Sequence, residues 1–231
     1  MFAKLYLIGY NYKVIIVVFY LIYQKWLTSM PTVNLKKKRI ECKIVYYGPP
    51  HGGKTSNLLY IHQNLANAES GPITSIDTKS DQLLFFDFLP LDVDKIKGCD
   101  IVVQLYTITG VTKFDSTRKL LLHNADGVIF VADSMAMQRE KNMLMLRDLQ
   151  KNLREFNSSI FKIPLVLEYN KRDLEDSEIA LMPIKQMEME LNNQLKGPSF
   201  PVSSLTGQGV KDAFNIVLEL VTTSLQAKIK N

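Results

Sequence analysis

The first candidate for chemistry is a loop of small residues between a predicted strand and a predicted helix. It runs from Gly48 to Thr55 as GPPHGGKT and fits the pattern G-x-x-x-x-G-K-[ST]. Glycines let backbone N–H groups close around phosphate oxygens, and the following helix adds its N-terminal dipole. The pattern predicts a phosphate-binding loop in which Lys54 reaches the β- and γ-phosphates and Thr55 holds Mg²⁺. The remaining candidate loop contacts are Gly48, Gly52, Gly53 and Ser56.

A second candidate indicates which base the nucleotide carries. The run Asn170-Lys171-Arg172-Asp173 follows a predicted strand and has the form N-K-x-D. An Asp carboxylate accepts from both the N1–H and the exocyclic N2–H₂ of guanine, and adenine lacks that pair of donors. We therefore expect Asp173 to select guanine and Lys171 to cover the face of the base. A second loop, Ser203–Leu205 (Ser203, Ser204 and Leu205), is expected to contact the base from another strand end.

Composition bounds the class of protein. The chain has 231 residues, of which 46% are hydrophobic and 22% charged, with two cysteines, Cys42 and Cys99. These values are typical of a globular domain and exclude disordered, collagen-like and disulfide-stapled classes. The net charge of +5 depends strongly on one short run, residues 36–39, so we expect no nucleic-acid partner. We read both cysteines as reduced thiols of a cytoplasmic protein.

The elements that must position these loops alternate along the chain. Strand-like apolar runs alternate with helical patterns, which is typical of βαβ units and a mostly parallel sheet with helices on both faces. We therefore predict an α/β fold with a single domain over roughly residues 40–226. The predicted strands are Cys42–Tyr47, Leu83–Leu89, Ile101–Tyr106, Val128–Asp133, Leu165–Tyr169 and Phe200–Ser203. The predicted helices are Lys54–Asn67, Lys113–Leu122, Arg139–Glu155, Pro183–Leu195 and Val210–Gln226.

The first 29 residues differ from the rest. Leu5–Tyr23 is dense in apolar side chains and would reach about 28 Å as a helix, nearly one hydrocarbon core. Asn11 and Lys13 near its middle oppose insertion, because a central Lys costs about 2.5–3.5 kcal/mol. Three readings stay open for residues 1–29: a dispensable or non-native leader, with Met30 as the natural start, a membrane anchor at the inner face of the cytoplasmic membrane, or a partner-binding segment.

Several further motifs carry a family resemblance. They are KIVYYGP at the first strand, LFFDFLPLD at Leu84–Asp92, LYTITG at Leu105–Gly110, DGVIFVADS at Asp126–Ser134 and NKRDL at Asn170–Leu174. Together they resemble the MglA group of bacterial Ras-like small GTPases, over residues 30–231. The resemblance implies a P-loop fold, GTP or GDP with Mg²⁺, and Gly110 as a further nucleotide contact. It also implies a roadblock-domain (MglB-like) regulator and motility or polarity effectors.

The sequence departs from that group where hydrolysis chemistry is expected. The group has Gln directly after Gly110, where it would orient the attacking water, and this chain has Val111, which cannot hydrogen-bond water. The group also tends to carry Arg where this chain has Gln82, so a candidate arginine finger is absent. Thr78 in the loop Gly71–Gln82 is the expected second Mg²⁺ contact and sensor of the γ-phosphate, with Thr74 as its rival.

These departures leave two functions open. An arginine finger is worth about 10³–10⁵ in rate, so we expect hydrolysis at or below about 10⁻⁴ s⁻¹ without a partner. The first reading is a regulatory GTPase that a partner completes. The second is a non-hydrolysing guanine-nucleotide-binding scaffold, with a membrane-anchored variant resembling the β-subunit of the signal-recognition-particle receptor. The leader supports that variant, and LFFDFLPLD does not.

Overall fold

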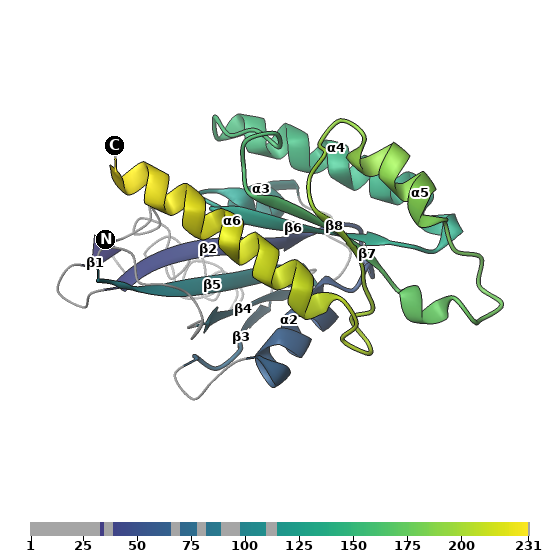
Figure 1. Cartoon of the computed structure of the whole chain (residues 1–231), viewed down its shortest axis with the longest axis horizontal. Helices are drawn as coiled ribbons and strands as arrows, with labels where there is room; N and C mark the ends of the chain where they lie inside the picture. The colour runs from purple at the N-terminus through teal and green to yellow at the C-terminus, as the bar shows by residue number, and fades with distance from the viewer. Residues whose placement is uncertain are drawn as a thin grey trace, which may run out of the picture.

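One sheet forms the middle layer of the protein. The computed structural model describes residues 33–34, 39–65, 70–77, 82–88, 98–109 and 115–230. Within them the strand order is β3-β4-β5-β2-β6-β7-β8, and β1 pairs with β2 off this path (Figure 1). The strands are β1 (Val33–Asn34), β2 (Arg39–Tyr47), β3 (Thr74–Asp77), β4 (Gln82–Phe88), β5 (Asp100–Thr109), β6 (Gly127–Asp133), β7 (Leu165–Asn170) and β8 (Ser199–Pro201).

The direction of the strands confirms the predicted α/β class. Strands β5, β2, β6, β7 and β8 pair in parallel, whereas β4 pairs antiparallel with both β3 and β5. β2 has β5 on one side and β6 on the other, so the chain changes direction across the sheet at this strand. Ligands of open α/β sheets bind beyond the carboxyl ends of strands at such a switch point. The loop that follows β2 begins there.

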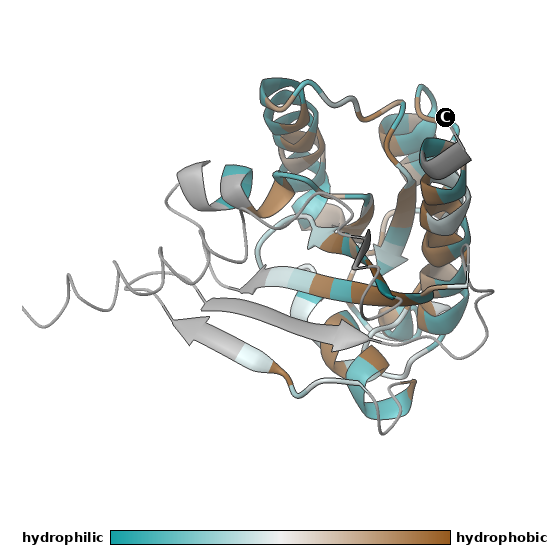
Figure 2. Cartoon of the chain, turned by 90° about the vertical axis from the view of Figure 1, so that its left-hand side faces the viewer, coloured by the Kyte–Doolittle hydropathy of each residue, from teal (hydrophilic) through white to brown (hydrophobic). Residues whose placement is uncertain are grey.

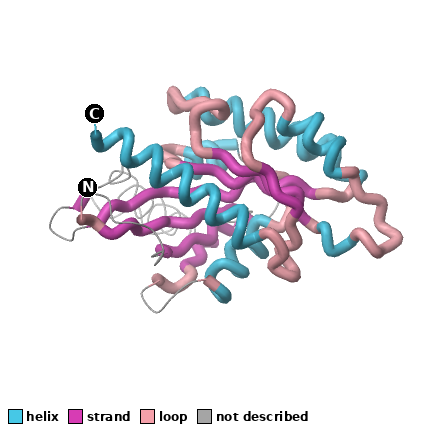
Figure 3. Tube along the Cα trace, in the orientation of Figure 1, coloured by secondary structure: helices cyan, strands magenta, loops and turns pink. Residues whose placement is uncertain are grey.

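Helices cover both faces of the sheet, as predicted (Figure 3). One face packs against α2 and α6, and the other packs against α3, α4 and α5 with the π-helix η3. Short 3-10 turns precede α4 and follow β7. The helices and turns are α2 (Lys54–Asn64), α3 (Asp115–Leu122), η1 (Ala136–Gln138), α4 (Arg139–Glu155), η2 (Arg172–Leu174), α5 (Ile184–Met187), η3 (Glu188–Asn192) and α6 (Val210–Lys230).

The alternation of side chains along β2 divides the core into two layers. Ile44 and Tyr46 face α2 and α6, and Val45 and Tyr47 face the opposite helices. All four are buried, as expected of a parallel strand with helices over both faces. Helices α4 and α6 carry hydrophobic residues beside hydrophilic ones (Figure 2), as is typical of helices that bury one side against a sheet. These layers hold the strand ends in fixed relative positions.

Besides the unpredicted β1 and a β8 that ends at Pro201 and not at Ser203, two segments differ more from the prediction. The predicted loop 71–82 contains β3, which pairs with β4 from Thr74↔Phe85 to Asp77↔Gln82, so Thr74 lies in a strand. Its pairing comes from hydrogen bonds to the next strand, which the polar local pattern does not reveal. The predicted helix Pro183–Leu195 is a short α5 continued by the π-helix η3. It ends where the Asn192 side chain exchanges hydrogen bonds with the backbone of Gly197.

Some predictions lie outside the described residues. These are the leader 1–29 with its apolar segment, Thr78, Gly110 and Val111. The ends of three predicted elements, at Asn67, Leu89 and Lys113, lie outside them as well. Among the helices that are described, none is long and apolar enough to cross a membrane.

The packing of α6 gives a stability prediction. Phe214 is buried between α6 and the sheet, while its neighbour Asn215 is exposed. Phe214→Ala should lower the free energy of unfolding by about 3–5 kcal/mol through lost burial and a cavity. Asn215→Ala, the matched control on the same helix, should change it by less than about 0.5 kcal/mol. Denaturant titration measures both, and equal midpoints for the two variants would contradict this packing.

Candidate functional site

Two glycines shape the loop between β2 and α2. Gly48 has φ +145°, and a Cβ there would lie 2.2 Å from the carbonyl oxygen of Val131. Gly53 has φ +98°, and its Cβ would lie 1.9 Å from Nδ2 of Asn170. Neither position has room for a side chain, and both have a backbone conformation that L residues rarely adopt. The loop therefore lies directly against the ends of β6 and β7.

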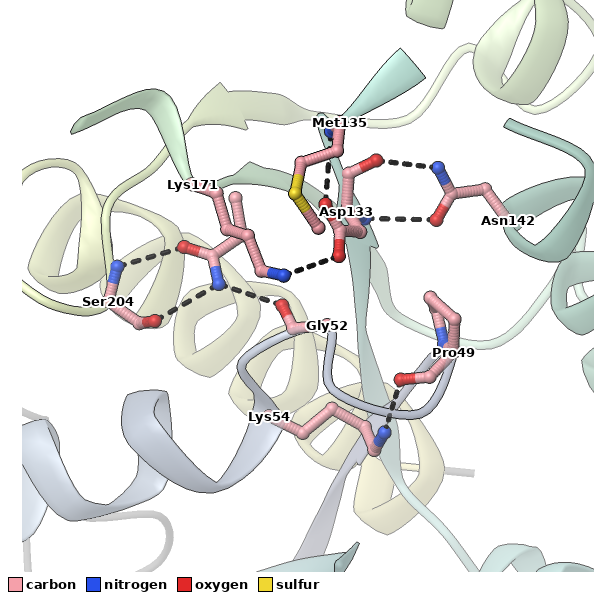
Figure 4. A network of polar contacts seen from close by, with 9 residues as sticks. Pro49, Gly52, Lys54, Asp133, Met135, Asn142, Lys171 and Ser204 are labelled. Carbon is pink, nitrogen blue, oxygen red and sulfur yellow. Dashed lines mark hydrogen bonds and ion pairs between the residues drawn. The ribbon is translucent and has the colours of Figure 1, made fainter. Parts of the chain in front are cut away.

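The loop leads into a helix N-terminus that fits an anion. Gly53 caps α2 without a side-chain hydrogen bond, and the first turn of α2 contains no acidic residue. Lys54 Nζ donates to the carbonyl oxygen of Gly48 at 3.0 Å and to that of Pro49 at 2.7 Å, the second of which is drawn in Figure 4. Burial lowers the pKa of Lys54 to about 8. A cation that is partly desolvated beside a positive helix end is the chemistry that phosphate oxygens match.

Asn170 joins the two motifs that the sequence separates. Its Nδ2 donates to the Gly52 carbonyl at 2.8 Å and to Ser204 Oγ at 3.0 Å, and its Oδ1 accepts from Ser204 N–H at 2.8 Å. The side chain is buried, so these bonds are shielded from water. We expected Asn170 among the base contacts, and in the structure its side chain connects the loop after β2 to the loop after β8.

The other expected base contacts lie around this junction. Ser203 Oγ donates to Asp173 Oδ1 at 2.6 Å and accepts from the N–H of Thr206 at 3.1 Å. Asp173 is exposed, and Leu205 is 80% exposed. One carboxylate oxygen of Asp173 is thus oriented by a hydroxyl, and the group faces solvent. The structure brings Asp173, Ser203, Ser204 and Leu205 to the same edge of the sheet as the loop after β2.

The candidate metal and hydrolysis positions are partly described. Thr55 is half-buried and Ser56 is exposed in the first turn of α2. No cluster of three or more His, Cys, Asp or Glu side chains suited to a metal occurs in the described ranges. Gln82 begins β4 and pairs in register with Thr109, the last residue of β5. Gln82, where we expected an Arg, thus lies beside the end of β5, and Val111, where we expected a Gln, lies outside the described residues.

Sequence reasoning missed a buried carboxylate beside this site. Asp133, the last residue of β6, has no exposed surface, and its Oδ2 lies 2.6 Å from Nζ of Lys171 (Figure 4). Lys171 was expected to cover the base, and its ammonium is held by this ion pair. A charged residue at the end of an otherwise apolar strand was the available signal. Asn142 on α4, which bonds the backbone of Asp133, had no such signal.

A second buried carboxylate lies beneath the loop. Glu168 on β7 is fully buried, and burial raises its pKa to about 8, while the side chain of Asn57 on α2 opposes the shift. Glu168 also raises the pKa of the buried Tyr46 hydroxyl, after the larger effect of burial. Asn57 Nδ2 donates to the Gly53 carbonyl at 3.3 Å. Asn57 thus both influences the pKa of Glu168 and contacts the loop.

Comparisons with known proteins agree with this geometry. The sequence model of the ADP-ribosylation factor family matches residues 27–221. The chain is 42% identical over 197 residues to the mutual gliding-motility protein MglA of Myxococcus xanthus, covering 85% of this chain and 98% of that protein. It is 26% identical over 173 residues to the Ras-related protein RabG2 of Dictyostelium discoideum, covering 74% and 78%.

The fold and the loop after β2 define a Ras-like P-loop GTP-binding protein. The chain belongs to the ADP-ribosylation factor family and, within the Ras-like GTPases, to the MglA group, which confirms the resemblance seen in the sequence. Proteins of this kind generally bind GTP or GDP together with Mg²⁺.

Glu168 gives a prediction about pH. Because its folded pKa is raised from 4.5 to about 8, folding favours the protonated acid. The contribution of Glu168 to the free energy of unfolding is fully present below about pH 4.5 and is lost as the pH rises to about 8. Between these values the loss approaches about 1.4 kcal/mol per pH unit. Glu168→Gln, which stays neutral, should remove that slope from the free energy of unfolding.

Chemical denaturation of wild type and variant between pH 5 and pH 8 measures the slope. Glu178→Gln, which replaces an exposed carboxylate, is the matched control and should follow the wild type. Parallel curves for wild type and Glu168→Gln would show that Glu168 is ionised in the folded protein throughout this range.

Proposed function

We propose that this protein is a guanine-nucleotide switch whose nucleotide lies across the loop Gly48–Ser56 and the loops that contain Asp173 and Ser203–Leu205. The observation that carries the proposal is the side chain of Asn170, which joins Gly52 to Ser204. Phosphate-loop and base-loop motifs that lie far apart in the sequence form one hydrogen-bonded unit. A phosphate site and a guanine site that are joined in this way suit a guanine nucleotide better than a free phosphate or a free base.

The phosphates are assigned to the first loop. In this proposal the backbone N–H groups of Gly53 and of the first turn of α2, Ser56 included, surround the phosphate oxygens, with Gly48 and Gly52 beside them. Lys54 exchanges its carbonyl partners for phosphate oxygens, which restores a charge that burial disfavours. The hydroxyl of Thr55 holds Mg²⁺, which neutralises phosphate charge, and Thr78 is proposed as its second protein contact.

The base is assigned to Asp173 and its surroundings. The exposed carboxylate of Asp173, oriented by Ser203, accepts from the two guanine N–H donors, and Lys171 lies over the base. Ser204 and Leu205 complete the base loop, and Gly110 is proposed to contact the phosphate side. A site that hydrogen-bonds a substrate N–H strongly rejects analogues lacking it, because its own polar groups are then left unpaired.

Hydrolysis is proposed to be slow without a partner. Valine at position 111 cannot orient water, and neutral Gln82 cannot neutralise transition-state charge as guanidinium does. An arginine finger alone contributes about 10³–10⁵ in rate, so the loss of both groups leaves mainly positioning by the phosphate loop. A partner that supplies these groups makes the protein a cycling switch. The same two residues favour the second candidate function, a non-hydrolysing scaffold.

The cellular role is proposed from the relative. The Myxococcus protein is named for gliding motility, and we propose that this chain controls motility or polarity machinery in the cytoplasm. A roadblock-domain (MglB-like) regulator is the proposed partner, and Leu5–Tyr23 is a proposed contact with the inner face of the membrane. The domain is proposed to span residues 30–231, after a leader of residues 1–29.

Asp173 tests the assignment of the base. Asp173→Asn replaces a pure acceptor with an amide, which still accepts from Ser203 but mismatches the guanine N–H donors. Affinity for GDP should fall more than about tenfold, whereas affinity for xanthosine diphosphate should rise. Competition binding measures both affinities. Asp176→Asn, a nearby exposed carboxylate, should leave them unchanged, and an unaltered preference for GDP in Asp173→Asn would move the base elsewhere.

Lys54 and phosphate release test the switch. The purified full chain should carry GDP or GTP, identified by chromatography. Lys54→Ala should carry none, whereas Lys211→Ala, an exposed lysine on α6, should match the wild type. Phosphate release from GTP should be about 10⁻⁴ s⁻¹ or slower for the protein alone.

A rate of about 1 s⁻¹ without a partner would contradict slow intrinsic hydrolysis. Acceleration by a roadblock-domain protein identifies a cycling switch. Bound GTP that persists in the presence of that protein identifies a scaffold.

A further inference from the structure

The backbone at Lys171 is unusual for a residue with a side chain. Lys171 has φ +71° and ψ +32°, a left-handed conformation in which a lysine is uncommon. It begins the turn between β7 and η2, and its side chain is 23% exposed. Such a conformation persists where surrounding contacts over-determine it. The Lys171 carbonyl accepts from the N–H of Leu174 at 3.2 Å, and its ammonium forms an ion pair with Asp133.

Asp133 is held at every polar group that the structure describes. Its backbone N–H donates to Asn142 Oδ1 at 2.9 Å, and its carbonyl accepts from Asn142 Nδ2 at 2.7 Å. Its Oδ1 accepts from the N–H of Met135 at 3.0 Å, and its Oδ2 faces Nζ of Lys171 at 2.6 Å (Figure 4). Asp133 has no exposed surface and Asn142 is 1% exposed. The carboxylate is therefore fixed in one orientation.

The register of two strands brings this carboxylate to the base-recognition turn. Asp133 and Asn170 are partners across β6 and β7, and the N–H of Ser134 donates to the Asn170 carbonyl at 3.0 Å. A buried carboxylate is costly unless it is paired, so Asp133 and Lys171 favour each other. The pair restrains a long, flexible side chain before any ligand binds, which reduces the entropy that ligand binding must overcome.

We propose that Asp133, held by Asn142, is a positioning residue for guanine-nucleotide binding that acts through Lys171. This inference rests on the proposed function. Asp133 does not touch the nucleotide in this account. It fixes the ammonium of Lys171, and through it the side chain that lies over the base, and so prolongs the time that a guanine nucleotide stays bound. A residue with only a folding role would instead affect nucleotide release independently of Lys171.

The test is a double-mutant cycle on nucleotide release. A fluorescent GDP analogue is loaded onto the full chain, and its dissociation is followed after addition of excess GDP. Asp133→Asn and Lys171→Met should each speed dissociation at least about tenfold, and the double variant should be no faster than the faster single variant. Lys171→Arg, which keeps a cation for Asp133, should recover part of the loss.

Glu190→Gln is the matched control. It removes the carboxylate of another ion pair, which Glu190 of η3 forms with Arg139 of α4 and which includes neither Asp133 nor Lys171. Its dissociation rate should equal that of the wild type. The proposal would be overturned if Asp133→Asn released the nucleotide at the wild-type rate. It would also be overturned if the rate increases of the two single variants multiplied in the double variant.

A second route applies if Asp133→Asn does not fold. Asn142→Ser removes the amide that holds the backbone of Asp133, and it should speed release in the wild-type background but not in the Lys171→Met background. Equal acceleration in both backgrounds would overturn the proposal. Failure of the wild-type chain to bind the GDP analogue would contradict the proposed function itself. If the wild type binds the analogue, the double-mutant cycle tests the role of Asp133 separately.

Discussion

The arrangement of the site depends on one close contact, between the backbone of Gly53 and the buried amide of Asn170. That contact leaves no room for a Cβ, and the same amide bonds the Gly52 carbonyl and the N–H and hydroxyl groups of Ser204. Both the Nδ2 and the Oδ1 atom of the amide have hydrogen-bond partners, and these bonds offset the free-energy cost of burying Asn170. The loop after β2 and the loop after β8 therefore hold one relative position, and a ligand that bridges them meets a preorganised surface.

Buried charge is concentrated just behind that surface. Asp133 at the end of β6 is neutralised by Lys171, whereas burial raises the pKa of Glu168 on β7, and neutralisation there requires a proton. Lys54 has a lowered pKa because it is partly buried. This part of the protein thus combines a cation whose charged form a phosphate would stabilise with carboxylates whose negative charge the protein itself neutralises. This division of charge suits an anionic ligand and keeps buried negative charge from opposing it.

Much of the fold was predictable because its signals are local. The strand predictions Cys42–Tyr47 and Val128–Asp133 each lie within an observed strand, and Arg139–Glu155 coincides with α4. Apolar runs and helical periodicity are properties of neighbouring residues. β3 was missed because Thr74–Asp77 is a strand only through its pairing with β4. The helix at Pro183–Leu195 was overestimated because its ending depends on Asn192 and Gly197, a contact that periodicity does not encode.

By itself, the sequence determined the phosphate-loop pattern, the N-K-x-D run and the family, since each is a matter of residue type and spacing. Only the tertiary structure decided that Asn170 links two loops and that Lys171 pairs with a buried Asp133. Both contacts follow from the parallel register of β6, β7 and β8, which sets strand ends from distant parts of the chain side by side. A motif specifies the chemistry that a residue can perform, and strand pairing specifies which neighbour that chemistry meets.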